Sequence, residues 1–365
     1  MFLEYLVGAI GLIPIYIFII RKLNLKLSTA LYIYSYRAIF SLVYIFYASN
    51  NPADANMYLM GGKDRGIIGT GFINRIIELS SFLSIKGYAL YSLFGLLGAV
   101  GCCYLYCAIK SCNIRSPKKM DTISIIFCFL PSLAFWTLAP GKDSIIFLVI
   151  NYALYSYIKL EENSIKINLK IIISILILLL IRPHVGASLV ISYIIFFTTQ
   201  IKKKRDAYLR LIFLLIVSIT FWQLIPFLQK YASIENYNLI DSFYLLEERF
   251  SVTSFEGSNS NYISRVIFFL LTPLPKISFS PLYLADYINT IYVVYYLYTI
   301  LKDQKSYKNI QSNHFFIFSI ILLLLLPLVI FNPGVATRQK WMLLPPLIVS
   351  LQKNRYLNYK KFKIH

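Results

Sequence analysis

Charged side chains are scarce in this sequence, and acidic ones are the scarcest. Of its 365 residues 14% are charged, and 16 Asp and Glu stand against 36 Lys and Arg. Histidine occurs only three times, and there is no Walker loop, no glycine-rich dinucleotide fingerprint and no His-x-Glu metal motif. ATP-driven and redox chemistry are therefore poorly supported, and we expect no cofactor and no bound metal.

Long apolar runs are abundant instead. Hydrophobic residues make up 58% of the chain and the mean hydropathy is +0.64, whereas soluble domains are about 45–50% apolar. A helix needs about 20 apolar residues to cross a bilayer. The runs that reach or approach this length are residues 2–20, 29–47, 88–109, 122–138, 144–158, 169–181, 185–199, 211–228, 282–301, 315–331 and 341–351.

These runs predict an all-α fold, a polytopic integral membrane bundle with about 11 spans. The shorter run 266–274 ends at Pro273-Leu274-Pro275, and we expect a re-entrant or interfacial segment there. The chain shows no internal repeat and no low-complexity linker. A single transmembrane domain over residues 1–365 is the simplest organisation.

Basic residues gather in alternate loops of this predicted topology. Most of the Lys and Arg lie in residues 21–26, 110–119, 159–170, 202–210, 302–308 and 353–363. The positive-inside rule places these segments in the cytoplasm, with the N-terminus outside and the C-terminus inside. The large outer loops are then residues 48–87 and 229–265. Topology and attraction to anionic membrane lipid account for the net charge of +20, so it predicts no nucleic-acid partner.

Three charged segments interrupt apolar runs on the side opposite the basic loops. They are residues 141–143, 182–184 and 338–340. A charge at the centre of a span costs roughly 2.5–3.5 kcal/mol on insertion scales, so such charges usually mark a reaction or transport site. Irregular backbone at that depth is tolerated only where protein or water surrounds it. We therefore expect broken helices that form a funnel open to the outer face.

Phosphate chemistry fits the residue types in the first two segments. Lys142 stands beside the start of a helix, where positive charge and free N–H groups favour an anion. Arg182 offers a planar fork that suits phosphate oxygens. Asp143 is a candidate N-cap of the same helix or the counter-charge of Arg182, and we include it among the candidate catalytic residues. His184 is a candidate general base.

The outer loops supply further candidates. Asp54 is a candidate general base or an acceptor for sugar hydroxyls, and Tyr58 follows one helical turn later. Residues 72–83 predict an amphipathic helix along the outer interface. In the second loop, Arg249 and Arg265 stand among interleaved aromatic and acidic residues, which suits a saccharide cleft.

Arg338 and Lys340 complete the predicted ring of cations. They close the segment 332–340, which we expect to be a polar turn between the last two apolar runs. Substrate binding is predicted for both residues.

These features resemble the bacterial O-antigen and capsule repeat-unit polymerases (Wzy-type) and, more loosely, the EpsG-like polysaccharide polymerases. The motif part is Pro-Ser-x-x-Phe-Trp at 131–136 followed by Gly-Lys-Asp at 141–143. The resemblance also includes an aspartate in an outer loop, Arg182 in a broken hairpin and Arg338 before a proline-containing helix. The Arg-x(10)-Gly and His-x(9)-Gly motifs of some of these enzymes are missing from residues 229–265, so donor and acceptor contacts are not separated by the resemblance.

The resemblance implies a metal-independent glycosyltransferase of the bacterial inner membrane, active in lipopolysaccharide or other polysaccharide biosynthesis. Its donor and acceptor would both be undecaprenyl-diphosphate-linked oligosaccharides, joined at the periplasmic face. Lys142, Arg182 and Arg338 would bind the diphosphate leaving group. Asp54 or His184 would take the acceptor proton, and the outer loop would orient sugars. The implied partners are this lipid-linked oligosaccharide, membrane lipid and a chain-length regulator protein.

Two other functions stay open at this point. One is a membrane glycosyltransferase that uses a polyprenyl-phosphate sugar; those enzymes often carry an early acidic pair, for which only Asp54 and Asp64 are available. The other is a flippase or transporter of lipid-linked oligosaccharide. A transporter is expected to show repeats or charges on both sides of the membrane, and here the functional charges lie on one side.

Overall fold

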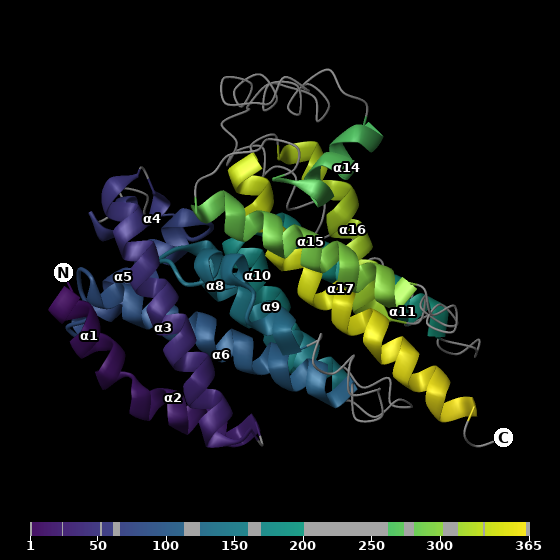
Figure 1. Cartoon of the computed structure of the whole chain (residues 1–365), viewed down its shortest axis with the longest axis horizontal. Coiled ribbons are helices and arrows are strands. Elements are labelled where there is room, and N and C mark those ends of the chain that lie inside the picture. Colours follow the sequence, from purple (N-terminus) through teal and green to yellow (C-terminus); the bar gives the residue numbers. More distant parts are fainter. Residues whose placement is uncertain are drawn as a thin grey trace.

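All regular secondary structure described in the computed structural model is helical, and the helices run alongside one another as a bundle (Figure 1). The described residues are 2–23, 25–51, 53–60, 66–112, 125–159, 169–200, 262–273, 281–301, 313–330 and 333–362. Within these ranges the all-α prediction is confirmed.

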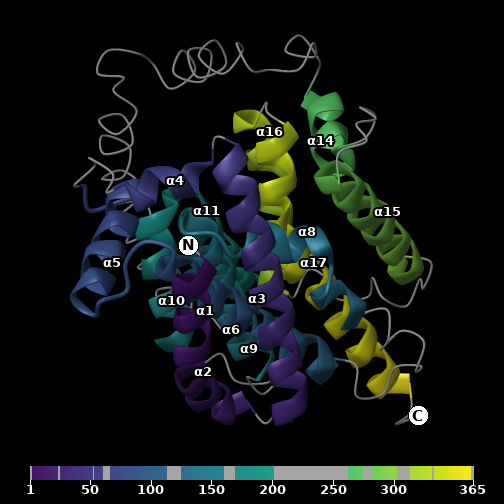
Figure 2. The same cartoon turned by 60° about the vertical axis from the view of Figure 1, so that its left-hand side comes forward.

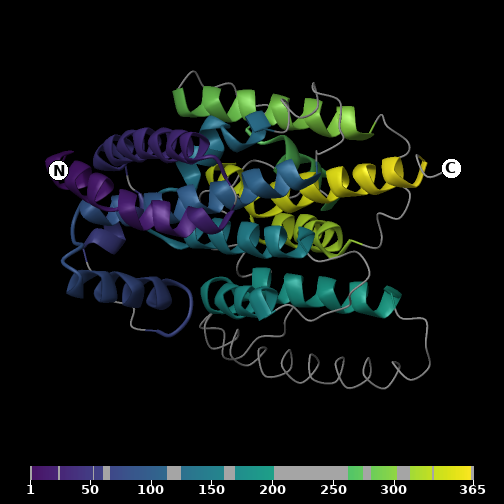
Figure 3. The same cartoon turned by 90° about the horizontal axis from the view of Figure 1, so that it is seen from below.

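The helices differ widely in length. In chain order they are α1 (Phe2–Gly11), α2 (Ile13–Ile20), the 3-10 helix η1 (Arg21–Leu23), α3 (Leu27–Asn50), α4 (Asp54–Leu59), α5 (Thr70–Phe82), α6 (Ala89–Cys112), α8 (Pro131–Trp136), α9 (Lys142–Ile158), α10 (Leu169–Ile181), α11 (Pro183–Gln200), α14 (Tyr262–Leu271), α15 (Pro281–Leu301), α16 (His314–Val329) and α17 (Pro333–Phe362). In Figure 2, α4 and α5 lie on one flank and α14 and α15 on the other. Figure 3 shows α15 (green) and the pair α10 and α11 (teal) on opposite sides of the bundle.

Helix α6 is central to the bundle. It packs against α9, α1 and α3, and it also contacts α17. A Cβ atom at Gly98 would lie only 2.3 Å from the backbone oxygen of Thr137. The missing side chain lets α6 approach the turn between α8 and α9, as small residues do at helix interfaces in membranes.

Three helices among the described residues are long and apolar enough to cross a bilayer. They are Phe2–Leu23, Leu27–Asn50 and Ala89–Cys112, which coincide with the first three predicted runs. Other apolar helices are shorter; α10, for example, has 13 residues and a length of about 20 Å. The run 211–228 and the loop 229–265 lie outside the described residues, apart from the start of α14. The figure of about 11 spans therefore stays a prediction.

Proline determines where four of the described helices begin. α8, α11, α15 and α17 start at Pro131, Pro183, Pro281 and Pro333, because proline fits a first helical turn, where no N–H partner is needed. The residue before a proline avoids helical backbone, and Leu130 is extended at φ −64° and ψ 129°. The predicted run 122–138 therefore contains a break before Pro131, and its residues 122–124 lie outside the described ranges.

The last predicted break is also shifted. Residues 333–340, expected as a turn, are helical because Pro333 already starts α17. The helix continues through Pro345 and Pro346. Arg338 and Lys340 are therefore held by a helix, and residues two apart on a helix do not share a face.

Basic residues lie at one end of the bundle, among them Lys110 in the last turn of α6, Lys159 after α9 and Lys353 on α17. Lys353 lies over the ring of Tyr157 near the C-terminal end of α9, 3.9 Å from its centroid. Cys112, at the end of α6, contacts the backbone of Val349. Helix α9 has 17 residues and spans about 25 Å, so its first residue, Lys142, lies far from this basic end.

Candidate functional site

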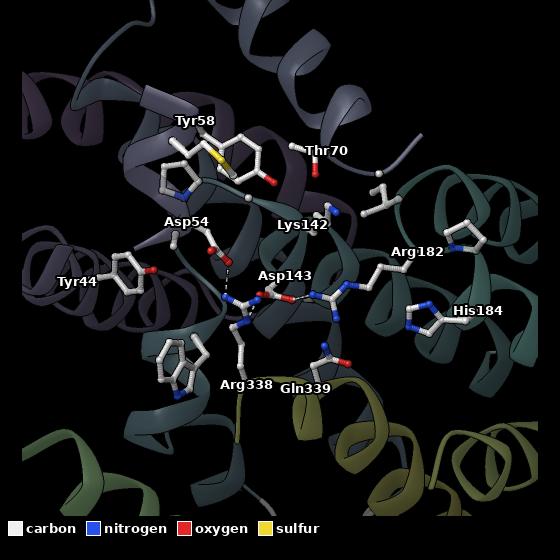
Figure 4. Close-up of a pocket in the computed structure, with 18 residues that line it drawn as sticks. Tyr44, Asp54, Tyr58, Thr70, Lys142, Asp143, Arg182, His184, Arg338 and Gln339 are labelled. Atoms are coloured by element: carbon white, nitrogen blue, oxygen red, sulfur yellow. Dashed lines mark hydrogen bonds and ion pairs between the residues drawn. The ribbon is translucent and has the colours of Figure 1, made fainter. Parts of the chain in front are cut away.

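A cavity of about 450 Å³ lies where the broken helices meet (Figure 4). Its walls come from α3, α4, the start of α5, the turn between α8 and α9, the junction of α10 and α11, and the beginning of α17. The residues predicted as functional that line it are Asp54, Tyr58, Lys142, Asp143, Arg182, His184 and Arg338. The fold thus brings together segments that are far apart in the sequence, in a volume typical of ligand sites.

Glycine in the turn before α9 shapes one wall of the cavity. Gly141 has φ 151° and ψ −168°, a region that residues with a Cβ atom rarely adopt. A Cβ atom there would also lie 3.4 Å from the ring of Tyr58. Because the chain turns at Gly141, α9 begins with Lys142 and Asp143 at the cavity.

A buried arginine supports the same turn from α3. Arg37 is 1% exposed, and its Nη1 donates to Thr137 Oγ1 at 2.5 Å. Its guanidinium also lies 5.1 Å from the centroid of the Phe147 ring. Thr137 is the C-cap of α8, so Arg37 ties α3 to the turn that leads into α9. The sequence signal for this role was a charge within an apolar run.

Asp143 is the centre of a network of ion pairs. Its Oδ1 lies 2.8 Å from Arg182 Nη2, and its Oδ2 lies 3.0 Å from Arg338 Nε. Arg338 Nη1 donates to Asp54 Oδ2 at 2.7 Å. Figure 4 shows Asp143 between the two guanidinium groups. The cap position of α9 is held by Gly141, and the side chain of Asp143 pairs with the two arginines.

The two halves of the network differ in burial. The side chains of Arg182 and Asp143 are 9% and 16% exposed, whereas that of Asp54 is 60% exposed. An exposed ion pair contributes about 0–1 kcal/mol. Removing one partner of a buried pair costs about 3–5 kcal/mol, because the other charge is left uncompensated. The arginines therefore depend mainly on Asp143.

Positive charge exceeds negative charge in the cavity. Lys142 lines it without a hydrogen bond or ion pair to any residue in the described ranges, while the carboxylates of Asp54 and Asp143 are engaged by arginines. The N-terminal ends of α9 and α11 also lie at the cavity, and their dipoles add positive potential. An anion is the ligand that this arrangement favours.

A short outer helix forms another wall. Tyr58 on α4 is 4% exposed, and burial raises the pKa of its hydroxyl. At neutral pH the hydroxyl stays protonated, so it serves as a hydrogen-bond donor and not as a base. The backbone N–H of Gly69 donates to Leu180 O at 2.8 Å, which anchors the chain before α5 to the end of α10.

The remaining predicted residues lie elsewhere. Lys340 is 5% exposed and faces a different, smaller cavity, where its Nζ donates to two backbone oxygens at the end of α14. Its predicted place in the ring of cations is corrected, because the helical start of α17 turns it away from Arg338. Arg265 lies on α14 and does not line the main cavity. Arg249 lies outside the described residues.

Several lining residues were missed by the sequence analysis. Tyr44 on α3, Thr70 on α5 and Gln339 on α17 all line the cavity. Gln339 adjoins a predicted cation, which is a usable signal. Tyr44 and Thr70 reach the cavity only because α3 and α5 fold beside it, and no local pattern marks them.

No protein-family model matches this chain, and neither does any curated protein or solved structure. No three His, Cys, Asp or Glu side chains within the described ranges are grouped so as to hold a metal ion.

Proposed function

We propose that this chain is a membrane glycosyltransferase that joins lipid-diphosphate-linked oligosaccharide repeat units into a polysaccharide at the outer face of the bacterial inner membrane. One observation carries the proposal. Cations from three distant segments, Lys142, Arg182 and Arg338, line a single cavity together with carboxylates.

The diphosphate of the donor fits the electrostatics of this cavity. Two phosphate groups offer several oxygens to the guanidinium forks of Arg182 and Arg338 and to the ammonium group of Lys142. The helix N-termini at Lys142 and Pro183 favour the same negative charge. In the transfer, the bond between the anomeric carbon and the phosphate oxygen breaks. The lipid diphosphate leaves with the electron pair, and the cations stabilise it.

The acceptor supplies the other half of the reaction. Its hydroxyl oxygen forms the new bond to the anomeric carbon, and its proton passes to a base. Asp54 and His184 both line the cavity and are the two candidates for this base. Tyr58, protonated and buried on the side of Asp54, is suited to donate a hydrogen bond to a sugar oxygen.

Asp143 has a double consequence for the proposed chemistry. It holds Arg182 and Arg338 in place across the cavity. It also occupies part of the hydrogen-bonding capacity that a diphosphate needs. Diphosphate binding therefore requires a partial exchange of the Asp143 carboxylate for phosphate oxygens.

The distribution of charge supports the proposed orientation. Lys110, in the last turn of α6, and Lys353 belong to the basic end of the bundle, and the cavity lies at the other end of α9. The length of α9, about 25 Å, approaches the hydrocarbon thickness of a bilayer, which is about 30 Å. By the positive-inside rule the basic end faces the cytoplasm and the cavity faces outward.

The experiment compares surface polysaccharide in a deletion strain that carries the wild-type gene or a variant. We expect Arg182→Ala to abolish polymer and leave single repeat units. Arg182→Lys keeps the positive charge but lacks the planar guanidinium that can make two parallel hydrogen bonds to a phosphate. We therefore expect this variant to make less polymer than the wild type and more than Arg182→Ala. Arg75→Ala, an exposed change on α5 outside the cavity, is the control and leaves polymer intact.

The deletion strain also discriminates between functions. Single repeats indicate a polymerase, truncated repeats indicate a transferase that adds one sugar, and accumulation in the cytoplasm indicates a flippase. Polymer of normal length in the Arg182→Ala strain, with the variant present in the membrane, contradicts the diphosphate assignment.

A further inference from the structure

A second cavity of about 130 Å³ lies between α8, α14, α15 and α17. The surface that its lining residues expose is almost wholly apolar, and Leu270, Val293, Leu297 and Leu344 are among them. Removal of apolar surface from water is what favours a ligand in such a place. The cavity is therefore suited to a hydrocarbon group.

Polar groups in the wall of the second cavity are paired within the wall or covered by other atoms. Lys340 Nζ donates to the backbone oxygens of Leu270 and Thr272. Thr290 Oγ1 donates to the same oxygen of Thr272 at 3.0 Å. The covered polar atoms are Asp286 Oδ1, Asn289 Nδ2 and Oδ1, and Trp341 Nε1. The space itself thus offers contact with carbon atoms and not hydrogen bonds.

One side of the second cavity opens toward the outside of the bundle. Leu271 on α14 and Val294 on α15 belong to its lining and are 38% and 48% exposed. One turn earlier on the same helices, Ile267 and Ile291 are exposed as well. Figure 2 shows both helices on one flank of the bundle. In a membrane such apolar side chains face the lipid chains, which are as apolar as leucine.

The opposite side of the second cavity adjoins the main cavity. On α8, Ser132 lines the second cavity and Trp136 lines the main one. Residues four apart on a helix share a face and lie about 5–6 Å apart. On α17, Arg338 lines the main cavity, and Thr337 and Lys340 on either side of it line the second. The second cavity is therefore bordered by the proposed diphosphate site and by the exposed flank of α14 and α15.

We propose that the second cavity holds an isoprenoid unit of the lipid carrier whose diphosphate binds in the main cavity. This inference rests on the proposed function and adds the path of the lipid chain to it. The chain of a polyprenyl diphosphate is attached directly to a phosphate, so it leaves the main cavity beside the arginines. An apolar cavity of about 150 Å³ holds a benzene molecule, and the second cavity is large enough for the five carbon atoms of an isoprenoid unit. The rest of the chain passes between α14 and α15 into the bilayer.

The test compares two probes by calorimetry on the purified full-length protein in nanodiscs. Pyrophosphate carries the head alone, whereas farnesyl diphosphate carries the same head and three isoprenoid units. We expect the wild type to bind farnesyl diphosphate at least about tenfold more tightly than pyrophosphate, because burial of two or three carbon atoms is enough for that factor.

Two variants with a matched control separate the cavity from general partition into the lipid. Val293→Phe fills the cavity, and we expect it to weaken farnesyl diphosphate binding by about tenfold while pyrophosphate binding stays unchanged. Val294→Trp obstructs the exposed side, where the fold tolerates bulk, and has the same expected loss. Ile291→Phe adds bulk to α15 outside the lining and keeps both wild-type affinities.

Photolabelling identifies the occupant. We expect a benzophenone-bearing farnesyl diphosphate to label Val293 and Leu297, and pyrophosphate to suppress that label by competition for the head site. Labelling of the same two residues by a photoreactive phosphatidylcholine, with no effect of pyrophosphate on either probe, would mean that the cavity holds ordinary membrane lipid and would overturn the proposal.

The calorimetry also separates the two possible failures. Equal farnesyl diphosphate affinities in Val293→Phe, Val294→Trp and Ile291→Phe, with pyrophosphate still bound, overturn the isoprenoid site and leave the proposed function standing. A wild type that binds neither probe contradicts the proposed function, and the isoprenoid site fails with it.

Discussion

Asp143→Asn removes the negative charge at the centre of the ion-pair network in the main cavity. The carboxylate lies 2.8 Å from Arg182 Nη2 and 3.0 Å from Arg338 Nε. The amide keeps the shape but removes the charge, and it leaves Arg182 without an anionic partner in the described part of the chain. Breaking a buried pair of this kind costs about 3–5 kcal/mol. We therefore expect a lower melting temperature in the absence of an anion.

The same change favours a bound anion. In the wild type, pyrophosphate has to displace Asp143 from at least one guanidinium group, and a hydrogen bond to a charged group is worth about 1.5–3 kcal/mol. Without that competition, we expect pyrophosphate to bind roughly tenfold to a hundredfold more tightly. Pyrophosphate then stabilises the variant more than the wild type at equal concentration.

The assay is a pyrophosphate titration of purified protein by calorimetry and by thermal shift. Asp54→Asn is the matched control: the Asp54 carboxylate is 60% exposed and, among the described residues, pairs with Arg338, so the expected change in affinity is severalfold at most. Equal or weaker pyrophosphate binding by Asp143→Asn would refute the competition between carboxylate and phosphate.

Three other tests, with four variants in all, address the remaining parts of the site. Gly141→Ala forces a strained backbone and a contact with Tyr58, so we expect polymer to disappear on gels and the free energy of unfolding to fall by about 1–3 kcal/mol in thermal unfolding. A normal amount of polymer would contradict this role of Gly141. Asp54→Asn and His184→Gln distinguish the two candidate bases. Replacement of the true base lowers turnover about 10²–10⁴-fold while pyrophosphate binding is kept. A loss of that size in both variants, or in neither, would argue against a single base. Arg37→Met removes the hydrogen bond from Arg37 to Thr137 in the turn before α9. We expect turnover in a transfer assay to fall while the protein still inserts and folds. Unchanged turnover would exclude a positioning role for Arg37.

Much of the helical layout follows from the length of the apolar runs. α3 and α6 coincide with apolar runs that no proline breaks, and burial of such a run in a bilayer or a helical core leaves little choice of structure. The break at Pro183 was also predictable, because a proline inside an apolar run ends a helix. Pro131 acts in the same way and breaks the apolar run 122–138.

The composition of the main cavity was predicted better than its geometry. A charge within an apolar run is a strong local signal, and it identified Lys142, Arg182 and Arg338. Lys340 carries the same signal but lies in the second cavity, because the helical start of α17 separates residues two apart. The contact between Asp54 and Arg338 joins the two ends of the chain, and no local pattern encodes it.

The most direct test of the central claim is the binding of lipid diphosphate to the purified protein by native mass spectrometry. The account predicts that undecaprenyl diphosphate is retained by the wild type, is displaced by pyrophosphate, and is lost when Arg182 and Arg338 are both replaced by Gln. Retention of the lipid at the same level by the folded double variant would contradict the account.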